Sequence, residues 1–250
     1  LKIEETRAVQ GISAKLNTIA KIRGEYVVAS KYDFWFLNAD LSPKFHAAMD
    51  PWFSANVLDL VGITALDKDA YVLMGSNKSL LRVRQNPEAD DVQGWPNFTA
   101  GRSHIEAVGG LGRARIDTER AKFSYIHSSA TDGRYVFMAT VPDNKNKKQF
   151  VISKALMKDW MLSGEFVPTA EMLKKDRSLG ELYVTGMVYE DGKLYAVSKN
   201  WNVLVVIDVA QEAVVEAWGL PEELTDIRGL VKDGSTFEVI DANRVVKLTM

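Results

Sequence analysis

The chain has 250 residues, of which 46% are hydrophobic and 26% charged, a globular balance that argues against disorder. The formal net charge is −2, so no basic excess exists to hold a phosphate backbone, and nucleic acid is not expected as a partner. Cysteine is absent, which excludes disulfides and a thiol nucleophile, and no apolar run approaches the roughly 20 residues of a membrane-spanning helix.

A hairpin-like pattern recurs along the chain. In each copy an apolar run leads to a turn, and an aromatic residue opens the next apolar run. Asp-Gly pairs in several of these turns favour the positive φ of a tight hairpin. First strands are expected at 17–22, 61–66, 124–130, 184–189 and 227–231. Second strands begin at the anchors Tyr26, Tyr71, Tyr135, Tyr195 and Phe237.

Further strands complete each copy. Third strands are expected at 34–39, 79–83, 150–154, 203–208 and 244–248, and fourth strands at 43–49 and 213–218. The interval from Tyr26 to Tyr71, like that from Tyr195 to Phe237, matches the roughly 40 to 50 residues of a propeller blade. Two longer intervals leave room for insertions at 86–120 and 143–182, and the first could hide a further blade.

The pattern therefore predicts an all-β fold, a β-propeller of five or six four-stranded antiparallel blades. The last copy lacks a fourth strand, and the alternating run KIEETRAV near the N-terminus could supply it and close the ring. Gly62, Gly186 and Gly229 precede three of the anchors and suit a crowded hub. We expect residues 1–250 to form one domain, cut from a longer polypeptide.

The segment 191–218, DGKLYAVSKNWNVLVVIDVAQEAVVEAW, resembles the repeats of the YVTN- and NHL-type β-propellers. The resemblance lies in a hydrophobic strand, a turn, a strand ending in Ile-Asp, a second turn and a Val-Val pair. It implies the propeller fold and is nearly silent on function, because propellers host enzymes, binders and scaffolds alike.

The most unusual segment is GGLGRARIDTER, residues 109–120. Its glycines would let the backbone approach a ligand, and Arg113 and Arg115 would share one strand face, an arrangement that suits a carboxylate or phosphate. The alternative is a turn followed by a strand whose arginines pair with Asp117 and Glu119.

The mouth of a central channel is a second candidate site. Asp226 and Arg228 begin an inner strand, Asp59 has a similar place, and His127 is the histidine best placed near the axis. These groups could bind a ligand, or act at the channel mouth of a propeller hydrolase or lactonase. They could equally line a wet tunnel and pair with one another. His104 and Glu106 resemble half a metal site, but no second pair matches them.

A third candidate is a cationic rim. Lys31, Lys78 and Lys199 occur on hairpins between second and third strands, with Trp201 beside the last. Such a rim could dock an acidic partner or a membrane headgroup surface. Polar turns that keep sheet edges soluble are the alternative.

Taken together, the sequence favours a non-catalytic ligand- or protein-binding scaffold, the extracytoplasmic or periplasmic domain of a membrane-attached protein. A protein partner or a small anionic ligand is expected, and the same polypeptide could carry a membrane segment. No catalytic set, metal site or cofactor site is recognised. A propeller hydrolase or lactonase, and an anion sensor using Arg113 and Arg115, are the alternatives.

Overall fold

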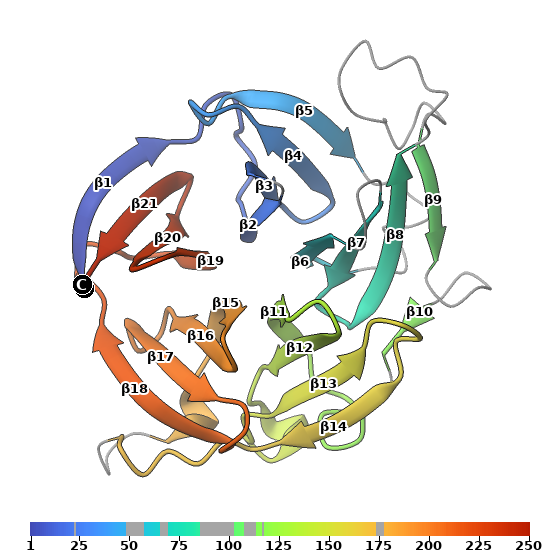
Figure 1. The fold of residues 1–250 in the computed structure, drawn as a ribbon, viewed down its shortest axis with the longest axis vertical. Coiled ribbons are helices and arrows are strands. Elements are labelled where there is room, and N and C mark those ends of the chain that lie inside the picture. The colour runs from blue at the N-terminus through green and yellow to red at the C-terminus, as the bar shows by residue number, and fades with distance from the viewer. Residues whose placement is uncertain are drawn as a thin grey trace.

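The computed structural model describes residues 1–22, 24–48, 58–65, 70–85, 103–107, 114–116, 118–173 and 178–250. Its strands form five antiparallel sheets arranged radially about one axis, so the fold is a five-bladed β-propeller (Figure 1). The all-β prediction is confirmed, because the described helices are two short 3-10 turns, η1 (Asn144–Asn146) and η2 (Leu179–Glu181).

Each blade runs from an inner strand at the axis to an outer strand at the rim. Blade 1 comprises β2 (Thr18–Ile22), β3 (Glu25–Ala29), β4 (Asp33–Leu37) and β5 (Pro43–Ala48). Blade 2 comprises β6 (Leu60–Ala65), β7 (Ala70–Gly75), β8 (Ser79–Gln85), β9 (Ser103–Ala107) and β10 (Ala114–Arg115). Blade 3 comprises β11 (Ile126–Thr131), β12 (Tyr135–Thr140), β13 (Ile152–Leu156) and β14 (Leu162–Phe166).

The two remaining blades bring the chain back to its start. Blade 4 comprises β15 (Val184–Glu190), β16 (Lys193–Ser198), β17 (Val203–Asp208) and β18 (Ala213–Gly219). Blade 5 comprises β19 (Ile227–Asp233), β20 (Thr236–Asp241), β21 (Arg244–Thr249) and β1 (Lys2–Ala8). The aromatic anchors predicted from the repeat all lie near the start of the second strand of their blade, as expected.

The structure has five blades, the lower of the two numbers that the sequence predicts. The insertion at 86–120 adds no blade, because its two described strands both pair with β8 and complete blade 2. β9 lies opposite residues 81–85 of β8, and β10 lies opposite Leu80 and Ser79. The two segments therefore share the outer position that one strand occupies in each of the other blades.

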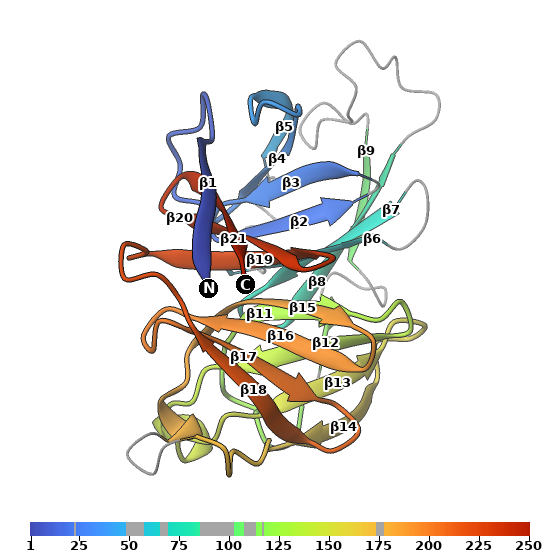
Figure 2. The same ribbon diagram turned by 60° about the vertical axis from the view of Figure 1, so that its left-hand side comes forward.

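The N-terminal strand closes the ring, as the sequence predicts. β1 pairs antiparallel with β21, from Lys2 opposite Thr249 to Ala8 opposite Arg244. The two termini consequently lie side by side (Figure 2). The N-terminal amino group also donates a 3.0 Å hydrogen bond to the carbonyl of Gly219 at the end of β18. Closure pairs both edges that an open arc would expose.

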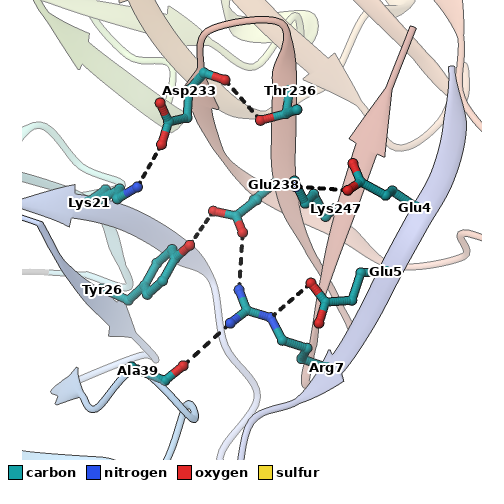
Figure 3. A network of polar contacts seen from close by, with 10 residues as sticks. All are labelled: Glu4, Glu5, Arg7, Lys21, Tyr26, Ala39, Asp233, Thr236, Glu238 and Lys247. Carbon is teal, nitrogen blue, oxygen red and sulfur yellow. Dashed lines mark hydrogen bonds and ion pairs between the residues drawn. The ribbon is translucent and has the colours of Figure 1, made fainter.

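A polar network reinforces this closure (Figure 3). Glu238 of β20 accepts a 3.1 Å hydrogen bond from Arg7 of β1 and a 2.5 Å bond from the hydroxyl of Tyr26 in β3. Its side chain is only 8% exposed, so both oxygens depend on these partners. Burial raises the pKa of Tyr26, and its bond to Glu238 acts in the same direction. One carboxylate thus joins the N-terminal strand, blade 5 and blade 1.

Glycines allow the inner strands to crowd at the axis. A Cβ placed on Gly186 would lie 2.3 Å from the carbonyl carbon of Gly229 in the next blade. A Cβ on Gly229, where φ is +59°, would lie 2.5 Å from the backbone nitrogen of Ile19. A Cβ on Gly62 would lie 2.0 Å from Oγ of Ser129. The predicted role of these three glycines in a crowded hub is therefore confirmed.

We predict that Gly186→Ala lowers the free energy of unfolding by about 1–3 kcal/mol, because the added methyl group meets backbone that cannot rotate away. Gly164→Ala in β14 is the matched control, since a Cβ there meets nothing within 4 Å. It should change stability by less than about 0.5 kcal/mol. Urea unfolding measures both variants, and equal stabilities would contradict the crowded hub.

Candidate functional site

Two hollows lie at opposite ends of the propeller axis. One, of about 340 Å³, is lined largely by the ends of the inner strands, including Ile22, Ala65 and Val231. The other, of about 270 Å³, lies where the inner strands begin, and we call it the mouth funnel. The inner strands and the residues just before them give the mouth funnel Asn17, Asp59, Val61, His127, Thr185 and Arg228. Loops add Lys15, Lys31 and Ser76. All five blades therefore contribute to it.

A recurring backbone feature brings side chains to the mouth funnel. In blades 2, 3 and 4 the register of the inner strand shifts at its second residue, between Leu60 and Gly62, Ile126 and Ser128, and Val184 and Gly186. The extra residues at these β-bulges are Val61, His127 and Thr185. A bulge bends the strand and redirects the extra side chain. The three residues that it redirects all line the mouth funnel.

Asp226 organises the charges at one side of the mouth funnel. Its carboxylate accepts from Lys199 at 2.6 Å and from Arg228 Nε at 3.2 Å, and it lies 3.0 Å from the Lys15 ammonium. Partial burial alone would raise the pKa of Asp226. The two lysine hydrogen bonds and the nearby guanidinium outweigh that effect and hold its pKa far below the usual range. Arg228 also donates to Oδ1 of Asn17 at 3.3 Å, which ties blade 5 to blade 1.

His127 and Asp59 face the same hollow with unused hydrogen-bonding capacity. Within the described residues, neither the imidazole nor the carboxylate has a hydrogen-bond partner or an ion pair. The ring of His127 is open to the funnel, but the protein walls limit its hydration, and this desolvation lowers its pKa. The charge of Arg228 adds to that effect, and Asp59 opposes it. His127 is therefore neutral near pH 7.

The mouth funnel and its bordering residues have a cationic balance. Lys15, Lys31, Lys199 and Arg228 face two carboxylates, Asp59 and Asp226, which leaves a net charge of +2 (4 − 2) with His127 neutral. The whole chain has a formal net charge of −2. Positive charge is thus concentrated at the mouth funnel, where low-dielectric walls strengthen its field.

The structure brings together one group of the residues predicted from the sequence. Asp59, His127 and Arg228 line the mouth funnel, Asp226 borders it, and Lys31 reaches it from the β3–β4 hairpin. Lys199 contributes through its bond to Asp226. Trp201 is half-buried and packs on the hydrophobic cluster between blades 3 and 4. Lys145, Lys147 and Lys148 lie on the β12–β13 hairpin, at the same end of the molecule.

Lys78 does not reach solvent, in contrast to the rim expected from the sequence. It is 1% exposed, and its ammonium donates to the hydroxyl of Thr118 at 3.1 Å and to the carbonyls of Ala121 and Ser124 at 2.7 and 2.9 Å. The physical reason is that the segment 118–124 passes over this hairpin and needs a donor for its inward carbonyls. Lys78 therefore holds that segment in place.

The Gly-Arg segment falls largely outside the described residues. Arg113 lies there, and Arg115 is described only through its backbone in β10, so the proposed anion site on this pair stays a prediction. His104 and Glu106 are likewise described only through the backbone of β9. In the described part of the chain, no three His, Cys, Asp or Glu side chains gather as a metal site would require.

Sequence reasoning missed Lys15, Asn17 and Thr185. A signal for Thr185 exists, because Val61, Thr185 and Arg228 each come directly before a hub glycine, and His127 comes before Ser128. Aligning the repeats on these glycines would have selected one funnel residue in each of three blades. Lys15 lies in the connection between β1 and β2, where the repeat gives no guidance. Asn17 is the first residue of the inner strand predicted at 17–22, and it lies just before β2.

Comparison with known proteins supports the fold and leaves the chemistry open. No protein-family model and no curated protein sequence matches the chain. The fold is similar to that of the glutaminyl cyclase of Myxococcus xanthus, with a TM-score of 0.66 and 11% identity over 98% of this chain and 94% of that one. It is also similar to the WD40 β-propeller domain of Doa1, with a TM-score of 0.52 and 7% identity over 96% of this chain and 65% of that one.

These likenesses show the propeller fold alone, at identities too low to transfer a function. One neighbour is an enzyme and the other is a WD40 domain, so the fold permits catalysis as well as binding. Among the described residues, no helix has the length and apolar character needed to cross a membrane.

We predict that Asp226 makes a pH-dependent contribution to stability. Its folded-state pKa lies below the ordinary 3.8, so the contribution is present above about pH 4 and is lost as the pH falls through the folded value. Asp226→Asn should therefore be less stable than the wild type near neutrality, and the gap should shrink in acid. Urea unfolding at a series of pH values measures it.

Asp191→Asn is the control for this titration. Asp191 lies in the exposed β15–β16 turn and its side chain has no ion pair within the described residues. Near neutral pH its stability should differ from that of the wild type by less than about 0.5 kcal/mol. A stability gap for Asp226→Asn that does not change with pH would contradict the assigned role of the three cations.

Proposed function

We propose that the protein is a ligand-binding β-propeller, and that its mouth funnel binds a small anion such as a carboxylate or a phosphate. The observation that carries the proposal is the convergence of Lys15, Lys31 and Arg228 on one hollow that contains a single lining carboxylate, Asp59. This function is non-catalytic, in keeping with the reading that the sequence favours. The YVTN- and NHL-like character of the repeat belongs to the same proposal and rests on residues 191–218, which span β16 to β18.

The shape of the mouth funnel limits the ligand to a small molecule. Its volume is about 270 Å³. That lies just below the roughly 300–1,000 Å³ of pockets for drug-sized ligands. A ligand of this size would replace ordered water and receive charge-assisted hydrogen bonds from groups that are already in place.

The cations of the mouth funnel are held before a ligand arrives. Asp226 fixes Lys15 and Arg228 by ion pairs of 3.0 and 3.2 Å. Lys31 lies 5.1 Å from the centre of the Tyr32 ring. Because these side chains are already restrained, an anion loses less conformational freedom to bind among them than among freely rotating lysines. Thr185 is less available, since its hydroxyl donates to the carbonyl of Ile227 at 2.7 Å.

Acid–base catalysis is the second candidate, and the observation that favours it is specific. His127, with a lowered pKa, is a neutral base near pH 7, and Asp59 faces the same hollow. An ester or lactone held by the cations would then lie between a base and a carboxylate. The enzyme among the structural neighbours is compatible with this candidate.

We predict that phosphate or a small carboxylate raises the melting temperature of the wild type, because the ligand binds the folded state only. Lys31→Gln should weaken that binding about tenfold, the equivalent of about 1.4 kcal/mol. The stability of the variant without ligand should not change, because Lys31 is exposed and is not ion-paired within the described residues. Thermal shift and titration calorimetry across a panel of anions measure both quantities.

Lys44→Gln is the matched control. Lys44 is an exposed lysine on the outer strand β5, paired with Glu25 at 2.5 Å and remote from the funnel lining. Its anion affinity should equal that of the wild type. An unchanged affinity in both Lys31→Gln and Arg228→Gln would contradict the proposal. A loss confined to Arg113→Ala would move the anion site to the Gly-Arg segment.

The same samples separate binding from catalysis. Proton NMR should show an ester or lactone that remains intact while bound if the protein is a binder. Consumption of the ligand by the wild type, abolished in His127→Asn with affinity retained, would instead support the hydrolase or lactonase candidate.

A further inference from the structure

An exposed apolar patch lies on the same end of the molecule as the mouth funnel, between blades 2 and 3. It consists of Leu58 in the connection before β6, with Phe123 and Tyr125 in the segment before β11, and we call it the aromatic patch. The exposed fractions of Leu58, Phe123 and Tyr125 are 36%, 67% and 42%. Together with Asn77 and Lys145 they line a hollow of about 610 Å³. Adjoining exposed apolar side chains of this kind mark interaction surfaces.

The aromatic patch stands on a rigid base. Ser124, between the two aromatic residues, is 1% exposed, and its carbonyl accepts a 2.9 Å hydrogen bond from the buried ammonium of Lys78. The carbonyl of Tyr125 accepts a 2.8 Å bond from the backbone of Val141. The segment is thus fixed with Ser124 inward and Phe123 and Tyr125 outward. A preformed surface avoids the ordering cost that a mobile loop would add to binding.

The surroundings of the aromatic patch are positively charged. Lys145 Nζ lies 5.2 Å from the centre of the Tyr125 ring, and Lys122 Nζ lies 5.9 Å from that of Phe123. Lys147 and Lys148 are exposed on the same β12–β13 hairpin as Lys145. None of these four lysines has an ion pair within the described residues, whereas Lys15, Lys193, Lys199, Lys232 and Lys247 all do.

The acidic group nearest in sequence to these lysines already accepts hydrogen bonds from other groups. The carboxylate of Asp143 accepts from the backbone of Lys145 at 2.8 Å and caps the η1 turn. It also lies within 3.4 Å of the Ser124 hydroxyl. The unpaired ammonium groups can therefore bind carboxylates of a partner, because charge complementarity favours an acidic partner.

We propose that the aromatic patch and its lysines form a docking surface for an acidic peptide segment of a partner protein. An apolar side chain of the peptide fills the hollow between Leu58 and the aromatic rings, and its carboxylates meet Lys122, Lys145, Lys147 and Lys148. A hollow favours a peptide side chain over a membrane surface, which would require projecting apolar groups. This surface is separate from the mouth funnel, so the proposal does not depend on anion binding there.

The test measures fluorescence anisotropy of labelled peptides with the full chain. Peptides that combine Glu or Asp with one Trp or Leu should bind, and binding should weaken with salt. The same peptides with the apolar residue changed to Ser, or the acids changed to Lys, should not bind. Phe123→Ser should weaken binding at least about tenfold, as truncation of a central aromatic anchor does.

Controls come from the opposite end of blade 3. Met161, 65% exposed, and the exposed Lys158 both lie in the turn region between β13 and β14. Met161→Ser and Lys158→Glu should leave the peptide affinity unchanged, whereas Lys145→Glu should reduce it. Circular dichroism of each variant checks that the fold is retained.

Three outcomes would overturn the proposal. One is an absence of binding to every acidic-apolar peptide. A second is equal loss of affinity in Phe123→Ser and Met161→Ser. The third is binding to vesicles containing phosphatidylserine without binding to any peptide, which would assign the surface to a membrane. Because anion affinity in the mouth funnel is measured separately, failure here leaves that proposal standing.

Discussion

The close approach of five inner strands about one axis is the constraint on which the rest of the structure depends. With so few blades the strands nearly touch, and Gly62, Gly186 and Gly229 stand where a side chain would strike the next blade. Directly before two of these glycines the inner strand bulges, and Val61 and Thr185 turn toward the mouth; His127 has the same position before Ser128. The packing of the hub thus determines which residue of each blade can meet a ligand.

Charge is distributed unevenly over this frame. The chain carries a formal net charge of −2, yet the mouth funnel and its borders carry an excess of cations, and the nearby aromatic patch is surrounded by unpaired lysines. Asp226 holds its three cations without cancelling them. Local groups of cations attract anions of different sizes, and this one physical cause links the two proposed binding surfaces.

The fold could be predicted from the sequence because the repeat is local. A turn and an aromatic anchor mark each hairpin in the sequence. The absence of a fourth strand in the last copy indicated that the N-terminal strand β1 supplies it. The number of blades could not be fixed from the sequence, because the segment 86–120 could hide a further blade. Only the pairing of β9 and β10 with β8 shows that it completes blade 2.

The candidate site was predictable in part for the same reason. The repeat shows where the inner strands begin, and the positions of Asp59, His127 and Arg228 at these starts make them predictable site residues. Lys15 and the cation triad around Asp226 depend on contacts between distant segments. The burial of Lys78 depends on the path of the segment 118–124, which no local pattern encodes. Long-range packing, rather than local preference, decides these cases.

The account's central claim is that an anion binds at the mouth funnel, among cations that the hub holds in place. Anomalous diffraction from crystals soaked in bromide tests it most directly, because the ion's position is observed rather than inferred. The account predicts a bromide peak in the mouth funnel near Lys31 and Arg228, absent from crystals of Arg228→Gln. Bromide found only on the outer surface, with none in the funnel, would contradict it.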